Sequence, residues 1–163
     1  MRGLNAAPFH CTPATGLLYI NAIDWCSTFK LGPEPKWEAT VPYTGLANGW
    51  GTNDPIDKWN GWINAIDALS GKTAWRVKTP SPMYAAITAT AGNVLFTGNL
   101  EGDFLALDAR DGKALYRFNT GGPIAGGVVT WEQGGRQYVA VASGHSGGSI
   151  PVSGSTTIVV FGQ

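Results

Sequence analysis

The pattern that decides the fold is written twice, as WINAIDALSGKTAW at residues 62–75 and as FLALDARDGKALY at residues 104–116. Each copy has the form Ala-x-Asp-x-x-x-Gly-x-x-x-aromatic, and corresponding positions lie 41 residues apart. A repeat of about 40–45 residues has the size of one β-propeller blade, which is a meander of four short strands. The repeat therefore predicts an all-β, propeller-like fold.

The second copy sits at the end of four predicted strands. These strands cover residues 84–90, 94–97, 104–109 and 114–119, and Gly-rich turns separate them. The last turn contains Asp111-Gly112, and Asp-Gly is a strong hairpin signal. One copy of the motif therefore marks the third and fourth strands of one blade.

The flanking segments predict further strands around two long loops. Two strands are expected before Asp24, the clearer at residues 17–23, and three more at 127–132, 137–142 and 156–161. Residues 27–60 and 144–154 lack a strand period and are predicted to be loops. The prediction is a partial β-propeller of about two and three-quarter four-stranded antiparallel blades, at residues 3–79, 82–120 and 123–163.

Such an arc cannot close into a ring, although closure is what protects the strand edges of a propeller. We therefore expect the remaining propeller blades to come from a larger protein, or a second copy of the chain to complete the ring. The fourth strand of the last blade is expected to come from a segment that precedes the chain.

Composition excludes several classes of function. Eleven acidic residues balance eleven basic ones, and no basic block is present, so no nucleic acid partner is expected. The apolar runs are far shorter than the ~20 residues of a membrane span, and no signal peptide is visible at the N-terminus. Cys11 and Cys26 have neither CxxC nor CxxCH spacing, so free thiols and a disulfide both stay open.

The residue types of the motif indicate packing rather than chemistry. Asp67 and Asp108 can accept hydrogen bonds from turn amides, and the motif glycines tolerate a positive φ. The small alanine leaves room for a flat side chain, and Trp75 can supply such a side chain to a neighbouring blade. Of the other tryptophans, Trp62 is expected to pack between blades, and Trp50 and Trp59 to anchor the insert.

The motif resembles the tryptophan-docking motif of quinoproteins, the eight-bladed β-propeller dehydrogenases that use pyrroloquinoline quinone (PQQ) and usually calcium. The first copy matches it fully, whereas the second has Tyr116 in place of the final Trp. Residues 3–26, 84–118 and 126–144 are similar to further segments of that family, although Ala6 stands where Trp is usual. The chain resembles the C-terminal third of a PQQ-dependent alcohol dehydrogenase.

The resemblance implies four positions that contact the cofactor. Asn5 matches an Asn that reaches PQQ from the central funnel. Tyr84 stands eight residues before the glycine of the Thr-Ala-Gly turn, where the methanol dehydrogenase branch has an aromatic near the cofactor. The loop GHSGG at 144–148 resembles a loop that reaches the cofactor with Gly and Trp, which implies Gly147 and, in place of the absent Trp, His145. Ordinary roles in a turn, a strand or a solvated loop stay open for each.

No catalytic or metal-binding residue is expected in the chain. The resemblance implies that the catalytic Asp and the residues that bind calcium lie outside this chain, so the chain alone is expected to be inactive. It further implies a small-molecule alcohol (or polyol or aldose) substrate, an electron acceptor such as a cytochrome or quinone, and a periplasmic location.

Two other functions stay open. Non-catalytic propeller scaffolds of the outer-membrane assembly type carry similar repeats. The tryptophans of the insert would also suit a small-molecule or carbohydrate-binding module. The segment around Asn5 favours the enzyme, because a scaffold has no need for an Asn in the funnel.

Overall fold

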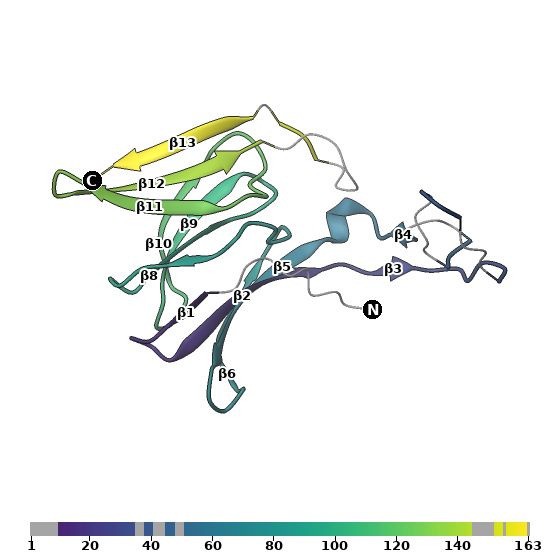
Figure 1. The fold of residues 1–163 in the computed structure, drawn as a ribbon, viewed down its shortest axis with the longest axis horizontal. Helices are drawn as coiled ribbons and strands as arrows, with labels where there is room; N and C mark the ends of the chain where they lie inside the picture. Colours follow the sequence, from purple (N-terminus) through teal and green to yellow (C-terminus); the bar gives the residue numbers. More distant parts are fainter. Residues whose placement is uncertain are drawn as a thin grey trace.

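A computed structural model of the chain describes residues 10–34, 38–40, 45–47, 51–144, 152–154 and 156–162. These residues form two four-stranded sheets and one three-stranded sheet, all antiparallel, and an arm that projects from the first sheet (Figure 1). The predicted all-β fold, with blades of four, four and three strands, is confirmed.

The three sheets follow one another along the chain. The first has the strand order β1–β2–β5–β6, with β1 at His10–Thr12, β2 at Leu17–Asp24, β5 at Asn60–Asp67 and β6 at Thr73–Thr79. The second runs from β7 to β10, with β7 at Thr88–Ala89, β8 at Val94–Gly98, β9 at Asp103–Asp108 and β10 at Ala114–Asn119. The third has the order β11–β12–β13, at Val128–Gln133, Arg136–Ser143 and Thr157–Gly162.

Because neighbouring strands run antiparallel, their connections lie alternately at two opposite ends of each sheet. At one end β2, β8 and β12 finish and β5, β9 and β13 begin. We call it the insert end, because the long connection between β2 and β5 leaves from it. At the opposite end, the turn end, lie the tight turns at 13–16 and 134–135 and both motif turns. We call the first strand of each sheet its inner strand; in the second sheet this is β7. Since β7 runs antiparallel to β8, which ends at the insert end, residues 84–87 before β7 lie at that end.

The motif joins the first sheet to the second. Their shared core consists of Tyr19, Ile63, Ala65, Met83, Ile87, Leu95, Leu107 and Ala109. The indole Nε1 of Trp75 donates a hydrogen bond to the Ala109 carbonyl oxygen at 3.0 Å, and the Tyr19 hydroxyl donates to the same oxygen at 3.1 Å. A Cβ on Gly112 would stand 2.7 Å from the indole, whereas one on Gly71 would meet nothing within 4 Å. The predicted docking role of Trp75 is confirmed at this seam.

Both motif turns are closed by their aspartate. Asp67 Oδ1 accepts a hydrogen bond from the backbone N–H of Ser70 at 2.7 Å, and Asp108 Oδ1 accepts one from that of Arg110 at 2.9 Å. The two glycines that follow have φ angles of 69° and 74°. Hydrogen bonds from Ser70 lower the pKa of Asp67, and those from Arg110 lower the pKa of Asp108 to about 2. These carboxylates therefore serve the turns.

The second and third sheets share another apolar core, and here the packing is less complete. The buried residues are Ala85, Phe104, Ile124, Val128, Val139 and Val141, and the rings of Phe104 and Phe161 stack at 4.5 Å between centroids. A groove of about 500 Å³ remains beside Phe161 and Tyr116. Strand β13 has no neighbour on its outer edge among the described residues, and its Ile158 is 72% exposed.

A buried carboxylate ties β9 to β10 at the insert end. Asp103 is 2% exposed and accepts hydrogen bonds from Arg117 at 2.7 Å and from Asn99 and Asn119 at 3.1 Å. Burial by itself raises the pKa of Asp103, but the hydrogen bonds, that of Arg117 foremost, outweigh it and hold the pKa below its usual range. Asp103 is therefore ionised when the sheet is intact.

The inner strand of the second sheet is shorter than predicted. A strand is predicted over residues 84–90, but β7 covers only Thr88–Ala89. The backbone before β7 bonds to the neighbouring sheets instead of to β8. The Asn21 amide donates to the Ala85 carbonyl at 2.8 Å, and the Ala86 N–H donates to the Gly126 carbonyl at 3.0 Å. Residues 84–87 thus connect all three sheets.

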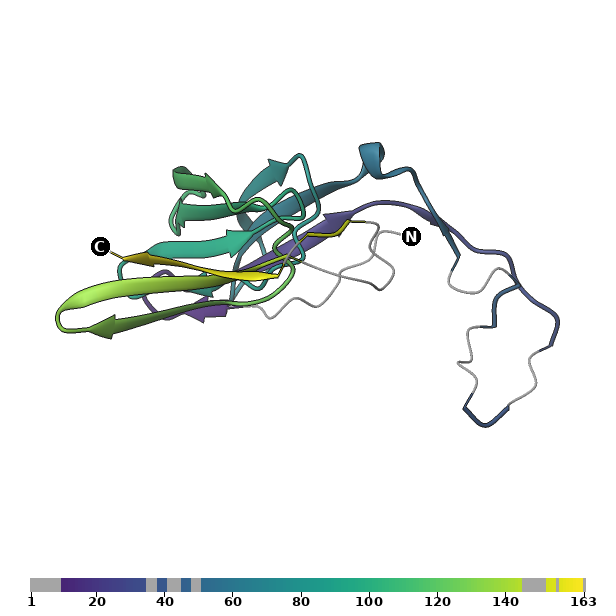
Figure 2. The same cartoon turned by 90° about the horizontal axis from the view of Figure 1, so that it is seen from above.

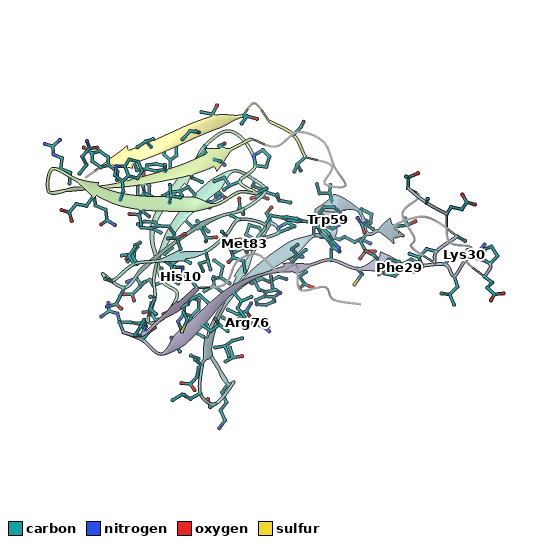
Figure 3. The ribbon with its side chains drawn as sticks, viewed as in Figure 1. His10, Phe29, Lys30, Trp59, Arg76 and Met83 are labelled. Carbon is teal, nitrogen blue, oxygen red and sulfur yellow. The ribbon has the colours of Figure 1, made fainter. Side chains whose placement is uncertain are left out.

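The predicted loop after β2 is a projecting arm. Strands β3 (Ser27–Thr28) and β4 (Thr52–Asn53) pair at its base, and Leu31 forms an isolated bridge with Leu46. The short 3-10 helix η1 (Ile56–Lys58) leads back into the first sheet. Figure 2 shows the arm reaching away from the sheets, and Figure 3 places Phe29 and Lys30 along it and Trp59 at its base.

Candidate functional site

Of the four predicted cofactor contacts, only Tyr84 falls within the described residues; Asn5, His145 and Gly147 lie outside them. Tyr84 is half-buried and lies at the insert end, three residues after Ser81 and shortly before β7. Strand β12 ends at Ser143 at that same end, directly before the GHSGG loop. The described part of the candidate site is therefore built around Tyr84.

An aromatic cluster surrounds Tyr84. The ring centroids of Trp25 and Tyr84 are 5.8 Å apart, and those of Trp25 and Trp59 are 4.1 Å apart. Trp25 directly follows β2 and Trp59 directly precedes β5, so neighbouring strands of the first sheet deliver both indoles to the insert end. The sequence pattern gives Trp25 no role of its own; the available signal was its position just past the end of a predicted strand, beside the insert.

Trp59 fixes the base of the arm. It is 3% exposed, and its Nε1 donates a hydrogen bond to the Asp54 carbonyl at 2.7 Å. The backbone N–H of Asp54 in turn donates to the Cys26 carbonyl at 2.9 Å, which closes the two stems of the arm on each other. The predicted anchoring role of Trp59 is confirmed, whereas Trp50 lies outside the described residues.

A buried amide holds the backbone next to Tyr84. Asn21 is 1% exposed and its Nδ2 donates to both the Ala85 carbonyl and the Thr97 hydroxyl oxygen, at 2.8 and 2.6 Å. Its Oδ1 is buried and has no hydrogen-bond partner in the described part of the chain. An unpaired buried acceptor costs about 1–3 kcal/mol, and the two hydrogen bonds that the Asn21 amide donates offset this cost.

A cleft lies beside the aromatic cluster. Its volume is about 250 Å³, and its wall includes Trp59, Pro82, Leu100 and the exposed carboxylates of Asp57 and Glu101. The wall is mostly apolar, which is the usual character of a small-molecule site. Its size is below the range of typical ligand pockets, about 300–1,000 Å³.

Trp62 lies on the face of the first sheet that points away from the second. Its Nε1 donates a hydrogen bond to an Asp24 carboxylate oxygen at 3.0 Å, and the Arg76 guanidinium lies 3.8 Å from its ring centroid. The contacts of Trp62 in the described structure are therefore to its own sheet rather than to a neighbouring blade.

The described part of the site fits a planar organic group and offers no set of metal ligands. Tyr84 and Trp25 are both incompletely buried aromatic rings, on which a flat conjugated molecule can stack. Within the described ranges, no three His, Cys, Asp or Glu side chains gather closely enough to hold a metal ion.

Cys11 and Cys26 are both free and exposed. No described helix is long and apolar enough to cross a membrane.

Comparisons with known proteins agree with the fold. The family described as "Outer membrane protein assembly factor BamB" matches residues 59–147. A quinoprotein ethanol dehydrogenase of Pseudomonas aeruginosa is 38% identical over 93% of this chain and 24% of its own length.

Solved structures of dehydrogenases also match the fold of this chain. A europium-containing methanol dehydrogenase has a TM-score of 0.71 at 32% identity, over 84% of this chain and 24% of that one. A quinohemoprotein alcohol dehydrogenase from Comamonas testosteroni has a TM-score of 0.70 at 29% identity, over 97% of this chain and 26% of that one.

The matches thus cover nearly all of this chain but only a part of each relative. The chain spans about a quarter of the length of the curated relatives that it matches. The docking contact of Trp75 is present in this chain, and its fold matches that of a methanol dehydrogenase. The chain belongs to the PQQ-dependent (quinoprotein) alcohol dehydrogenase family of β-propeller proteins.

Proposed function

We propose that the chain forms the C-terminal portion of a PQQ-dependent dehydrogenase that oxidises alcohols, polyols or aldoses and passes the electrons to an acceptor. The observation that carries this proposal is the 38% identity to a quinoprotein ethanol dehydrogenase over 93% of the chain. The position of Tyr84 and Trp25 at the insert end supports it. The three blades are proposed to cover residues 3–79, 82–120 and 123–163.

The proposed role of the chain is to bind and orient the cofactor. Tyr84 would contact PQQ through its ring, and Asn5, His145 and Gly147 would contact it from neighbouring segments. PQQ, when bound, supplies the quinone that accepts the reducing equivalents of the alcohol. The catalytic base and the metal ligands are proposed to lie outside this chain. The metal is proposed to be calcium, and because one related structure contains europium, the metal deserves its own measurement.

The proposed partners follow from the same reading. The remaining propeller blades, or a second copy of the chain, would cover the outer faces of the first and third sheets. A cytochrome or a quinone would take the electrons, and the location would be the periplasm.

The test compares the complete dehydrogenase that would contain this chain with the 163-residue chain alone. Alcohol-dependent dye reduction is measured with PQQ and calcium present or withheld. The complete protein should require PQQ, and the chain alone should show no turnover. Steady turnover by the chain alone would contradict the placement of the catalytic residues, and a complete protein that neither binds PQQ nor oxidises any alcohol would contradict the function.

A non-catalytic scaffold is the second candidate, and one observation favours it. The family that matches residues 59–147 is described as an outer-membrane assembly factor. That region contains the docking repeat, which serves blade packing and is of equal use to a scaffold. A scaffold would show no change in protein fluorescence on titration with PQQ, whereas the dehydrogenase should show saturable quenching.

A further inference from the structure

We infer that Trp25 is a positioning residue, which holds the ring of Tyr84 in place for the cofactor and links it to the base of the arm. This inference rests on the proposed function, because it concerns the same site. It adds a residue to which neither the sequence pattern nor the comparisons give a role.

Tyr84 lies outside the regular strands of the second sheet. Strand β7 begins only at Thr88, so the ladder with β8 does not constrain the backbone at residue 84. The main chain beside Tyr84 is anchored by the bond from the Asn21 amide to the Ala85 carbonyl at 2.8 Å. That bond fixes the backbone next to Tyr84, and the neighbouring aromatic side chains contact its ring.

Trp25 is an aromatic neighbour of Tyr84. Its ring is tilted by 37° to the ring of Tyr84, at 5.8 Å between centroids. This separation is within the 4.5–7 Å of favourable aromatic pairs, which contribute about 0.5–1.5 kcal/mol beyond the area they bury. Because Trp25 is itself only half-buried, it needs support from behind to hold another ring.

Trp59 gives this support. The rings of Trp25 and Trp59 are 4.1 Å apart, and Trp59 is 3% exposed and hydrogen-bonded to the Asp54 carbonyl. The contacts therefore run without a gap from the stem of the arm, through Trp59 and Trp25, to Tyr84. Since the arm and the insert end are joined through these rings, a change at the stem alters the orientation of Tyr84.

The affinity test uses the complete dehydrogenase and compares the wild type with Trp25→Leu, Trp25→Phe, Tyr84→Leu and Trp131→Leu. Trp131 is the matched control, because it stacks on Tyr138 at 5.3 Å in the third sheet, away from the insert end. PQQ affinity is measured by fluorescence titration. Loss of the aromatic pair with Tyr84 should weaken PQQ binding about 2- to 10-fold in Trp25→Leu. Trp25→Phe should recover most of the affinity, and Trp131→Leu should match the wild type.

A double-mutant cycle and a spectroscopic signal separate positioning from general destabilisation. In the Tyr84→Leu background, Trp25→Leu should have no further effect on PQQ affinity. In protein labelled with 3-fluorotyrosine, the resonance missing in Tyr84→Phe should shift in Trp25→Leu, with or without PQQ, and stay unshifted in Trp131→Leu.

The outcomes are distinct. Wild-type affinity in Trp25→Leu, or an additive effect with Tyr84→Leu, overturns the positioning role while the proposed function stands. An unshifted Tyr84 resonance in Trp25→Leu overturns it as well. Failure of the wild-type protein to bind PQQ refutes the proposed function and this inference with it.

Discussion

Alanine at the two motif glycines should destabilise the chain unequally. Gly71 and Gly112 occupy the same position of the repeat and have nearly the same φ, 69° and 74°. A left-handed conformation costs a non-glycine residue roughly 1–2 kcal/mol, so this part of the loss should be equal. The two sites differ only in what faces them across the seam.

The difference can be worked out from the neighbours of each new Cβ. At Gly112 it would stand 2.7 Å and 2.8 Å from two carbons of the Trp75 ring and 2.9 Å from Val77, whereas at Gly71 nothing lies within 4 Å. Overpacking costs about 1–3 kcal/mol, and the indole cannot retreat without losing its bond to Ala109. We expect about 1–2 kcal/mol for Gly71→Ala and about 2–5 kcal/mol for Gly112→Ala.

The assay is urea unfolding of the 163-residue chain, followed by tryptophan fluorescence under reducing conditions. A third variant, Trp75→Leu, provides the internal check. In its background the extra loss in Gly112→Ala should shrink, because the flat ring that the methyl group meets is gone. Equal losses at Gly71 and Gly112, or an undiminished difference without Trp75, would refute the docking of Trp75 on this turn.

Three further predictions concern the arm, the seam and the buried carboxylate. Trp59→Phe keeps an aromatic ring but loses the bond to Asp54, so limited proteolysis of residues 26–58 should quicken about 5-fold while cleavage of the sheets is unchanged. Trp75→Phe should cost about 0.5–1 kcal/mol in urea unfolding, at the low end for one hydrogen bond, because Tyr19 still satisfies the Ala109 carbonyl; a loss above 3 kcal/mol would contradict this. The folded-state pKa of Asp103 lies below its ordinary value of 3.8, so its stabilising contribution is present above about pH 4 and disappears as the pH falls through the folded pKa. Wild type and Asp103→Asn should therefore differ most in stability at pH 5–7 and converge towards pH 2, and a constant difference would argue against ionised Asp103.

The repeat made most of the fold predictable. Its glycines, aspartates and alternating apolar residues act within one hairpin, where neighbouring residues in the chain decide the geometry. Strands β8 to β13 lie within one residue of their predicted bounds. Segment 84–87 could not be predicted in the same way. It alternates like a strand, but its hydrogen-bond partners Asn21 and Gly126 come from other sheets.

The candidate site was predictable only in part, for a related reason. Tyr84 could be named because its spacing from the Thr-Ala-Gly turn is local. Trp25 could not, because its importance comes from contacts with Trp59 and Tyr84, which are remote in the chain. Asn5, His145 and Gly147 lie outside the described residues and stay predictions.

The seam between the first two sheets is pinned at both of its ends. Near the turn end, the Ala109 carbonyl accepts hydrogen bonds from Trp75 and Tyr19. Towards the insert end, the Asn21 amide donates hydrogen bonds to Ala85 and Thr97. One attachment point would allow one sheet to pivot on the next, but two separated points fix the angle between them. In a closed ring these angles must add up to a full turn. The same few hydrogen bonds therefore help to fix the angle between the first two sheets, and the angles at all seams together determine how many blades a closed ring can hold.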